Sequence, residues 1–254
     1  MGEFEKQGAV WDEWAPYYNE DSLGSAEPVA RGLARLAPQR SALELGIGAG
    51  RVALPLARLG VTVTGLDASA QMLRRLEERR GDLPVRGRIA DMAAFTVSKP
   101  VPLIYVVSST LYLLTTPERQ LSCLEACARA LSADGRVVIE AAVPGGTGLP
   151  LKTELLVRGV DEEGVRLSVI QHDAAAQTLT AQEVRLDGSG LRMRHVTRRY
   201  VHVAELDLMA HYAGLRLVAQ YGGWELDACA SGRSQRISVY SLAGNRDGFS
   251  LRGR

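Results

Sequence analysis

Residues 42–51 read Ala-Leu-Glu-Leu-Gly-Ile-Gly-Ala-Gly-Arg. An apolar stretch rich in strand-forming residues runs directly into three glycines at alternate positions, Gly46, Gly48 and Gly50, and a helical pattern follows from Val52. Glycines let the backbone turn sharply and let a ligand approach where a Cβ atom would clash. The order of strand, glycine turn and helix therefore predicts a binding site for a nucleotide-type ligand.

The next apolar run supports this prediction. It covers residues 61–66, Val-Thr-Val-Thr-Gly-Leu, and leads directly to Asp67. A carboxylate at the end of the second strand of a βαβ unit can accept hydrogen bonds from both hydroxyls of a ribose. We interpret residues 41–67 as a nucleoside-binding βαβ unit.

The spacing of the glycines narrows the choice of nucleoside. A dinucleotide-binding turn has the pattern G-x-G-x-x-G, whose third glycine would stand where this sequence has Arg51. A P-loop needs Gly-Lys-Ser or Gly-Lys-Thr, which the turn lacks. Glu44 precedes the first glycine by two residues, and a carboxylate at this strand end repels an anionic ligand and favours a cationic one.

Residues 44–50 resemble the first signature of class I S-adenosylmethionine-dependent methyltransferases, whose ligand carries a sulfonium and an ammonium group. Asp67 and Asp91-Met92 stand where later signatures of that family belong. Residues 108–115 and 222–224 carry a closer likeness to bacterial small-molecule methyltransferases of specialised metabolism. A glycine turn in an unrelated α/β protein is the alternative interpretation.

The resemblance implies a set of cofactor contacts. The glycines would pack against the amino-acid end and the ribose, Glu44 would lie near the ammonium, and Asp67 would bind the ribose hydroxyls. Asp91 would accept a hydrogen bond from the exocyclic amine of adenine. Each acid also has an alternative role within the fold: Asp67 as a helix cap, Asp91 as a turn residue and Glu44 as a support of the loop. The complete expected set is Glu44, Gly46, Gly48, Gly50, Asp67, Ala68, Asp91, Met92 and Ser108.

The alternation of strands and helices up to residue 143 predicts an α/β fold with a Rossmann-like, doubly wound, mostly parallel seven-stranded sheet. Period-two stretches then predict an antiparallel β insert after strand five. We expect an N-terminal helical lid (1–40), a methyltransferase core (41–143 and 203–243), an insert that covers the acceptor site (144–202) and a disordered tail (244–254). Strands are expected at 41–46, 61–66, 85–90, 101–107, 136–142, 215–221 and 237–242, and in the insert at 154–160, 165–172, 178–186 and 191–201.

Composition describes an ordinary globular protein. The 254 residues carry a net charge of +1, and no basic stripe with interleaved aromatic residues predicts a nucleic-acid partner. No apolar run approaches the roughly 18–20 residues of a membrane span, and the N-terminus lacks a signal-peptide core, so we expect a cytoplasmic protein. The cysteines lack metal-binding spacing, and we expect no metal and a reduced, buried Cys123 and Cys127. The doublet Arg198-Arg199 is interpreted as a solvated end of an element.

Methyl transfer is an in-line displacement at an already activated carbon, so the protein must mainly align the reactants and exclude water. A base is needed only where the acceptor loses a proton. His172, on the expected insert, is the first catalytic candidate, followed by Tyr18 and Glu140. The position of Tyr18 is similar to that of a tyrosine in the lid helix of related enzymes. A structural role is the alternative for His172.

The predicted function is S-adenosylmethionine-dependent methyl transfer to an O, N or C atom of a small molecule in natural-product biosynthesis. One alternative is ring closure or cyclopropanation on the same scaffold. Another is a protein that binds S-adenosylmethionine or S-adenosylhomocysteine without turnover. A nicotinamide oxidoreductase is disfavoured by Arg51 and Glu44. The expected partners are a small-molecule acceptor and at most a second copy, as a monomer or homodimer, with neither nucleic acid nor membrane.

Overall fold

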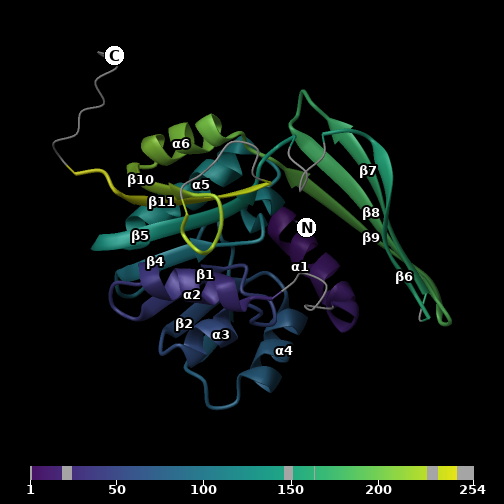
Figure 1. Ribbon diagram of the computed structural model, residues 1–254, viewed down its shortest axis with the longest axis horizontal. Coiled ribbons are helices and arrows are strands. Elements are labelled where there is room, and N and C mark those ends of the chain that lie inside the picture. The colour runs from purple at the N-terminus through teal and green to yellow at the C-terminus, as the bar shows by residue number, and fades with distance from the viewer. Residues whose placement is uncertain (1, 19–24, 146–150, 163, 228–233, 245–254) are drawn as a thin grey trace.

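The protein folds into a core around one large sheet, with a second, smaller sheet beside it and helix α1 between the two (Figure 1). This computed structural model describes residues 2–18, 25–145, 151–162, 164–227 and 234–244. The expected disordered tail, apart from Gly244, lies outside the described residues. None of the described helices is long and apolar enough to cross a membrane.

The large sheet has seven strands in the order β10-β11-β5-β4-β1-β2-β3. Neighbouring strands from β5 to β3 pair in parallel, whereas β11 runs antiparallel to both β5 and β10. The predicted fold class is therefore confirmed. The strands are β1 (Ser41–Leu45), β2 (Thr62–Asp67), β3 (Val85–Ile89), β4 (Val101–Val106), β5 (Leu131–Ala142), β10 (Leu215–Tyr221) and β11 (Gln235–Leu242).

Helices cover both faces of this sheet, and the central strand β4 shows why. Its successive side chains point to opposite faces: Leu103 and Tyr105 pack with α2 and α3, while Ile104 and Val106 pack with α5 and α6. A strand buried on both faces needs the continuous apolar run that residues 101–107 provide. The core helices are α2 (Glu27–Leu36), α3 (Ala53–Arg58), α4 (Ala70–Arg80), α5 (Pro117–Ala130) and α6 (Val203–Tyr212), with the short helix η3 (Thr110–Leu113) after β4.

The strand order reverses between β1 and β4. From β1 the chain moves outward through β2 to β3, and from β4 it moves the other way to β5, so the loops after β1 and β4 border a crevice. In open α/β sheets, ligands bind at the carboxyl ends of the strands at this point. The two loops touch, because a Cβ atom built on Gly46 would lie 2.5 Å from Cγ2 of Thr110.

The insert is a four-stranded antiparallel sheet in chain order, β6 to β9. Asp187 pairs with Gly190, so the β8–β9 turn is a two-residue hairpin made by Gly188 and Ser189. One end of the sheet joins the core, since Ile170, Ala181 and Val196 are buried, the first two of them in the cluster that α5 and α6 form. The insert strands are β6 (Glu154–Asp161), β7 (Gly164–Asp173), β8 (Thr178–Asp187) and β9 (Gly190–Arg199).

The N-terminal segment contains α1 (Glu3–Trp14) and the single turn η1 (Ala15–Tyr17). Helix α1 is fixed to the start of α4: Asp12 Oδ1 accepts hydrogen bonds from Ser69 Oγ at 2.6 Å and from the backbone amide of Gln71 at 2.8 Å. The backbone of α1 also approaches closely, because a Cβ atom on Gly8 would lie 2.5 Å from the carbonyl oxygen of Ala68. Helix α2 packs into the core instead. It lies within residues 1–40, which we expect from the sequence to form the lid.

Candidate active site

A cavity of about 700 Å³, including its mouth, lies at the carboxyl ends of β1 and β2 beneath α1. This volume is in the range of about 300–1,000 Å³ that is typical of small-molecule sites. Six of the expected cofactor residues line it: Gly46, Gly48, Asp67, Ala68, Asp91 and Met92. Glu44, Gly50 and Ser108 do not belong to this lining in the part of the chain that the structure describes.

The three glycines serve different purposes. Gly46 and Gly48 have φ angles of +77° and +54° and line the cavity, and a Cβ atom on Gly48 would meet no atom within 4 Å. Gly50 has a φ angle of +85°, but a Cβ atom there would lie 2.5 Å from Leu76. Gly50 therefore allows packing against α4, whereas Gly48 leaves space for a ligand.

Asp67 connects the glycine turn to the next helix. Its Oδ2 accepts a hydrogen bond from the backbone amide of Gly48 at 2.7 Å, and its Oδ1 accepts one from the amide of Ser69 at 2.9 Å. Ser69 is the N-cap of α4, and its hydroxyl accepts from the backbone amide of Met72. Burial raises the pKa of Asp67, and the hydrogen bonds from Ser69 and Gly48 partly oppose that rise. Each carboxylate oxygen still has acceptor capacity, which the ribose of a bound nucleoside requires.

Glu44 lies behind the glycine turn. Its carboxyl is buried and accepts a hydrogen bond from the Tyr105 hydroxyl at 2.9 Å. Burial raises the pKa of Glu44 to about 8, because desolvation outweighs the opposing effects of Tyr105 and Arg51. At neutral pH the carboxyl is mostly protonated, so the repulsion of anions that the sequence predicts from a charged Glu44 is weakened.

Asp91 is held by an arginine that the sequence does not single out. Arg119 donates two hydrogen bonds to its carboxylate, at 2.9 and 3.1 Å, and also lies 3.3 Å from Glu3 Oε2. The Asp91 carboxylate in addition accepts from the amide of Ala93. The position of Asp91 at the cavity is thus fixed by α5, and through Arg119 it is joined to α1.

Helix α1 closes the cavity with Phe4, Gln7 and Trp11, and Tyr18 follows just after it. Gln7 donates to the carbonyl oxygen of Leu113, and Trp11 and Tyr18 meet edge to face with ring centroids 6.0 Å apart. The sequence singled out Tyr18 in this segment but not Phe4 or Gln7. Their spacing relative to Trp11, seven and four residues, is the period of one helix face and would have identified them.

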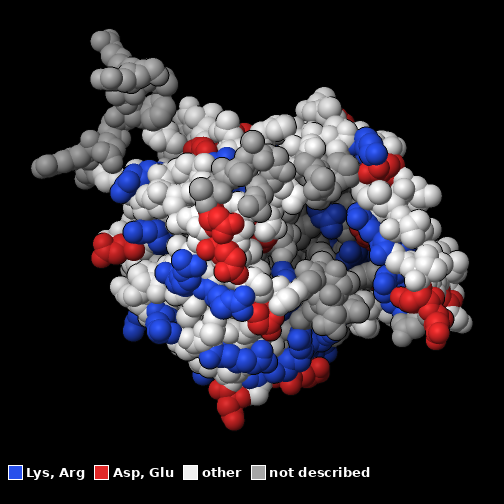
Figure 2. All heavy atoms as spheres, in the orientation of Figure 1, with Lys and Arg blue, Asp and Glu red and all other residues white. Residues whose placement is uncertain are grey.

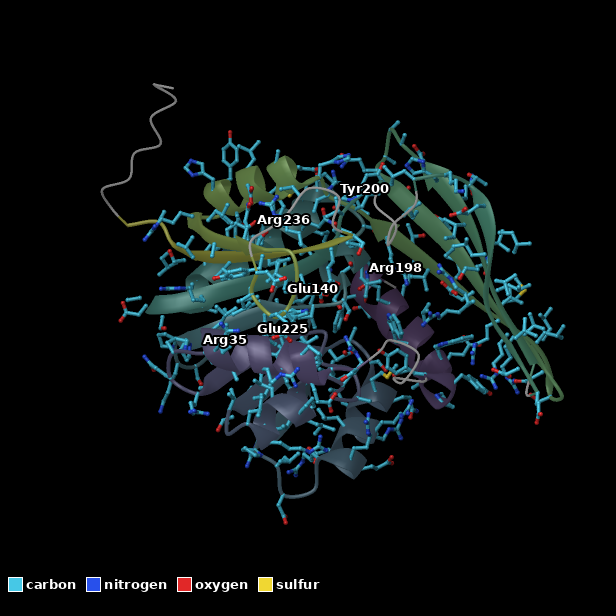
Figure 3. All side chains as sticks on the ribbon, viewed as in Figure 1. Arg35, Glu140, Arg198, Tyr200, Glu225 and Arg236 are labelled. Carbon is cyan, nitrogen blue, oxygen red and sulfur yellow. The ribbon has the colours of Figure 1, made fainter. Side chains whose placement is uncertain are left out.

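The three catalytic candidates lie in different places. Tyr18 lines the cavity. Glu140 lies on β5, where Figure 3 labels it. It accepts a hydrogen bond from the backbone amide of Ser108 at 2.7 Å, and both Ser108 and Ser109 have a φ angle of +57°. Glu140 therefore helps to hold a strained turn at the end of β4. His172 lies away from the cavity lining, on β7, with Nε2 3.0 Å from the Tyr200 hydroxyl.

Three comparisons with known proteins agree with this geometry. Residues 42–135 match a family model described as a methyltransferase domain. The CcbJ methyltransferase from Streptomyces caelestis is 32% identical, with a TM-score of 0.80, over 86% of this chain and 95% of that one. A cypemycin N-terminal methyltransferase from Streptomyces is 27% identical over 69% of this chain and 72% of its own length.

The fold is also shared with CalS10, a SAM-bound amino pentose methyltransferase from Micromonospora echinaspora involved in calicheamicin biosynthesis. It is 19% identical, with a TM-score of 0.68, over 89% of this chain and 94% of that one. Among the described residues, no group of three or more His, Cys, Asp or Glu side chains is arranged to hold a metal ion. The chain belongs to the class I S-adenosylmethionine-dependent methyltransferases, and S-adenosylmethionine is its methyl donor.

Proposed function

We propose that the enzyme methylates an amine nitrogen of a small molecule made in specialised metabolism. The observation that carries the proposal is the lining of the cavity, which combines three aromatic side chains, Phe4, Trp11 and Tyr18, with no histidine, lysine or arginine among its described residues. A neutral amine attacks without a base, and aromatic faces stabilise the positive charge that forms on the nitrogen. The similarity to a cypemycin N-terminal methyltransferase supports an amine acceptor.

S-adenosylmethionine supplies a methyl group on a sulfonium, which leaves readily. We propose that Gly46 and Gly48 lie against its amino-acid end and ribose, Asp67 accepts from the ribose hydroxyls, and Ala68 borders the same pocket. Asp91 and Met92 would hold the adenine. For Glu44, Gly50 and Ser108 we propose supporting roles, since Glu44 bonds Tyr105, Gly50 allows contact with Leu76, and Ser108 Oγ accepts from Arg51.

Tyr18 is the proposed catalytic contact, because its side chain lines the cavity beside α1. Glu140 would act by positioning Ser108. A catalytic role for His172 stays a prediction, which exchange of His172 for Asn would test through the pH dependence of kcat.

The wider organisation is part of the same proposal. Helix α1 and η1 act as the lid, residues 144–202 cover the acceptor, and the enzyme works in the cytoplasm as a monomer or homodimer, without a nucleic-acid or membrane partner.

Calorimetric titration with S-adenosylhomocysteine tests the cofactor site. The wild type should bind, and Asp67→Ala should bind at least tenfold more weakly, since lost hydrogen bonds to a partly buried carboxylate are worth about 1–3 kcal/mol. Asp82→Ala, which removes an exposed carboxylate elsewhere, is the matched control. Equal binding by wild type and Asp67→Ala would contradict the assignment of Asp67.

Mass spectrometry with paired acceptors tests the reaction. Each pair consists of a primary or secondary amine and the hydroxyl compound of the same skeleton. N-methylated product from the amines alone is the expected result. O-methylated product from the hydroxyl partner would contradict the amine proposal, and a product that retains a new ring would favour the ring-closure alternative.

A further inference from the structure

A second groove, of about 1,160 Å³ including its mouth, lies between the N-terminal segment and one face of the insert sheet. Its lining is strongly basic: five arginines, Arg158, Arg166, Arg185, Arg194 and Arg198, accompany a single acid, Glu183. Figure 2 shows basic side chains gathered in the hollow between the core and the insert. This concentration of like charge contrasts with the net charge of +1 of the whole chain.

Strand register brings these side chains to one face. Ser168 on β7, Glu183 on β8 and Arg194 on β9 are direct neighbours across three strands. Arg198 lies four residues after Arg194 on β9 and therefore points to the same face. Figure 3 labels Arg198 in the space between β9 and α1. Arg199, the next residue, points to the other face, where it pairs with Glu205 at 2.6 Å.

Three of the five arginines form a hydrogen bond or an ion pair with an acid or a hydroxyl group. Arg158 Nε donates to Ser168 Oγ at 2.8 Å, and that hydroxyl donates to Glu183 Oε2 at 2.5 Å. Arg166 lies 3.3 Å from Asp161, and Arg185 lies 2.7 Å from Asp187. These two acids lie near the hairpin ends of the insert, so their arginines are already neutralised.

Arg194 and Arg198 differ, since neither makes a hydrogen bond or an ion pair within the described parts of the chain. Nε and Nη1 of Arg194 are buried without a partner, and its guanidinium stacks over the rings of Trp11 and Trp14 at 4.5 and 4.7 Å. Burial lowers the pKa of Arg194 to about 10 and also lowers that of Arg198. Both arginines are only partly exposed, and Glu183, the acid in the lining of the groove, forms an ion pair with neither of them among the described residues. Two neighbouring guanidiniums in this setting are stabilised when an anion binds beside them.

The groove adjoins the cofactor cavity, because Tyr18 lines both. A molecule whose anionic end lies at Arg198 can therefore extend past Tyr18 toward the methyl group. We propose that Arg194 and Arg198 form the subsite that binds an oxyanion, a carboxylate or a phosphate group, of the methyl acceptor. The guanidinium fork suits either group, since both offer two oxygens in one plane to its parallel N–H donors. This inference rests on the proposed function, in which the acceptor enters beside Tyr18.

Arg198→Met is the sharper test, because Arg198 makes no aromatic stacking contact among the described residues, whereas loss of Arg194 would also loosen the rings of α1. Arg198→Lys keeps the charge without the fork. Arg86→Met is the matched control, since Arg86 is exposed on β3, far from the groove in the sheet order. Saturation with S-adenosylhomocysteine keeps the cofactor cavity filled during every titration.

Inorganic pyrophosphate and acetate serve as probes by calorimetry. We expect the wild type and Arg86→Met to bind at least one of them, Arg198→Met to bind it about tenfold or more weakly, and Arg198→Lys to lie between. Preference for pyrophosphate identifies a phosphate-bearing acceptor, and preference for acetate a carboxylate. Binding of neither probe, or equal binding by Arg198→Met, overturns the proposal.

Binding of S-adenosylhomocysteine separates this inference from the proposed function. Arg198→Met should bind it as tightly as the wild type, which also shows that the variant is folded. Loss of anion binding with intact cofactor binding supports the subsite. Failure of the wild type to bind S-adenosylhomocysteine would instead contradict the cofactor site, whatever the probes do. If Arg198→Met does not fold, Arg198→Gln and Arg198→Lys decide the question by the same titrations.

Discussion

The cofactor cavity and the arginine groove meet at Tyr18, but they are built differently. Backbone atoms form much of the cofactor cavity, since Gly46 and Gly48 have no side chains and the Gly48 amide donates to Asp67. Long side chains on antiparallel strands form the second. The cofactor site therefore depends on the conformation of the glycine turn, and few substitutions within that turn preserve it. The acceptor side depends on side chains that can change while the sheet stays intact.

The largest expected effect comes from adding a methyl group at Gly46. Gly46→Ala places Cβ 2.5 Å from Thr110 at a φ angle of +77°, so both overpacking and backbone strain oppose folding. We expect the free energy of unfolding to fall by about 3 kcal/mol. Urea unfolding measures it, with Gly223→Ala as the control, because a Cβ there meets no atom within 4 Å. Equal stability of the two variants would contradict the role of loop conformation.

Gly48→Ala separates binding from folding within the same turn. Its Cβ meets no protein atom within 4 Å but enters the cavity lining, at a φ angle of +54°. We expect affinity for S-adenosylhomocysteine to fall by about 2 kcal/mol, roughly thirtyfold, with a smaller loss of about 1 kcal/mol in stability. Calorimetry and urea unfolding of the same sample give both values. A variant that loses stability but binds normally would show that Gly48 is needed only for the turn.

The buried Glu44 predicts a dependence of stability on pH. Its pKa is raised from 4.5 to about 8 on folding, so between these values the folded protein binds more protons than the unfolded chain. The free energy of unfolding therefore falls as the pH rises through this range. Glu44→Gln stays neutral and still accepts from Tyr105, so it should remove roughly 3–4 kcal/mol of that fall between about pH 5 and pH 8.

Urea unfolding at both pH values, without cofactor, measures this difference. Glu78→Gln, at an exposed position on α4, is the control and should keep the slope of the wild type. The same slope in Glu44→Gln would show that the carboxyl is charged in the folded protein.

The smallest expected effect lies in the insert. Ser168→Ala removes the hydroxyl that joins Arg158 to Glu183, and we expect a loss of about 1 kcal/mol in stability with unchanged affinity for S-adenosylhomocysteine. Ser98→Ala, on an exposed loop, is the control for thermal unfolding. Weakened cofactor binding in Ser168→Ala would contradict the independence of the cofactor cavity from the insert sheet.

Most of the core could be predicted because its signals are local. The glycine turn and the strand ends each depend on residues within a few positions of one another. The first four core strands begin and end within one residue of the predicted bounds. β5 and β11 differ more, since β5 starts at Leu131 rather than at residue 136 and β11 starts at Gln235 rather than at residue 237.

The arginine groove could not be predicted in the same way. Arg198-Arg199 was expected to be solvated, yet Arg199 is buried against Glu205 and Arg198 faces the groove, because successive strand residues point to opposite faces. Which face is covered depends on how the insert lies against α1. Similarly, Arg119 reaches Asp91 and Glu3 from distant parts of the chain, and no local pattern marks those contacts.

Tyr18 lines both the cofactor cavity and the arginine groove, and this shared position has a thermodynamic consequence. If a ligand in one cavity moves Tyr18 and so alters affinity in the other, the reverse must hold by the same factor, because coupling between two binding equilibria is reciprocal. The factor by which S-adenosylhomocysteine changes the affinity for pyrophosphate therefore equals the factor by which pyrophosphate changes the affinity for S-adenosylhomocysteine. Cofactor and acceptor would then report on each other through a single phenol ring.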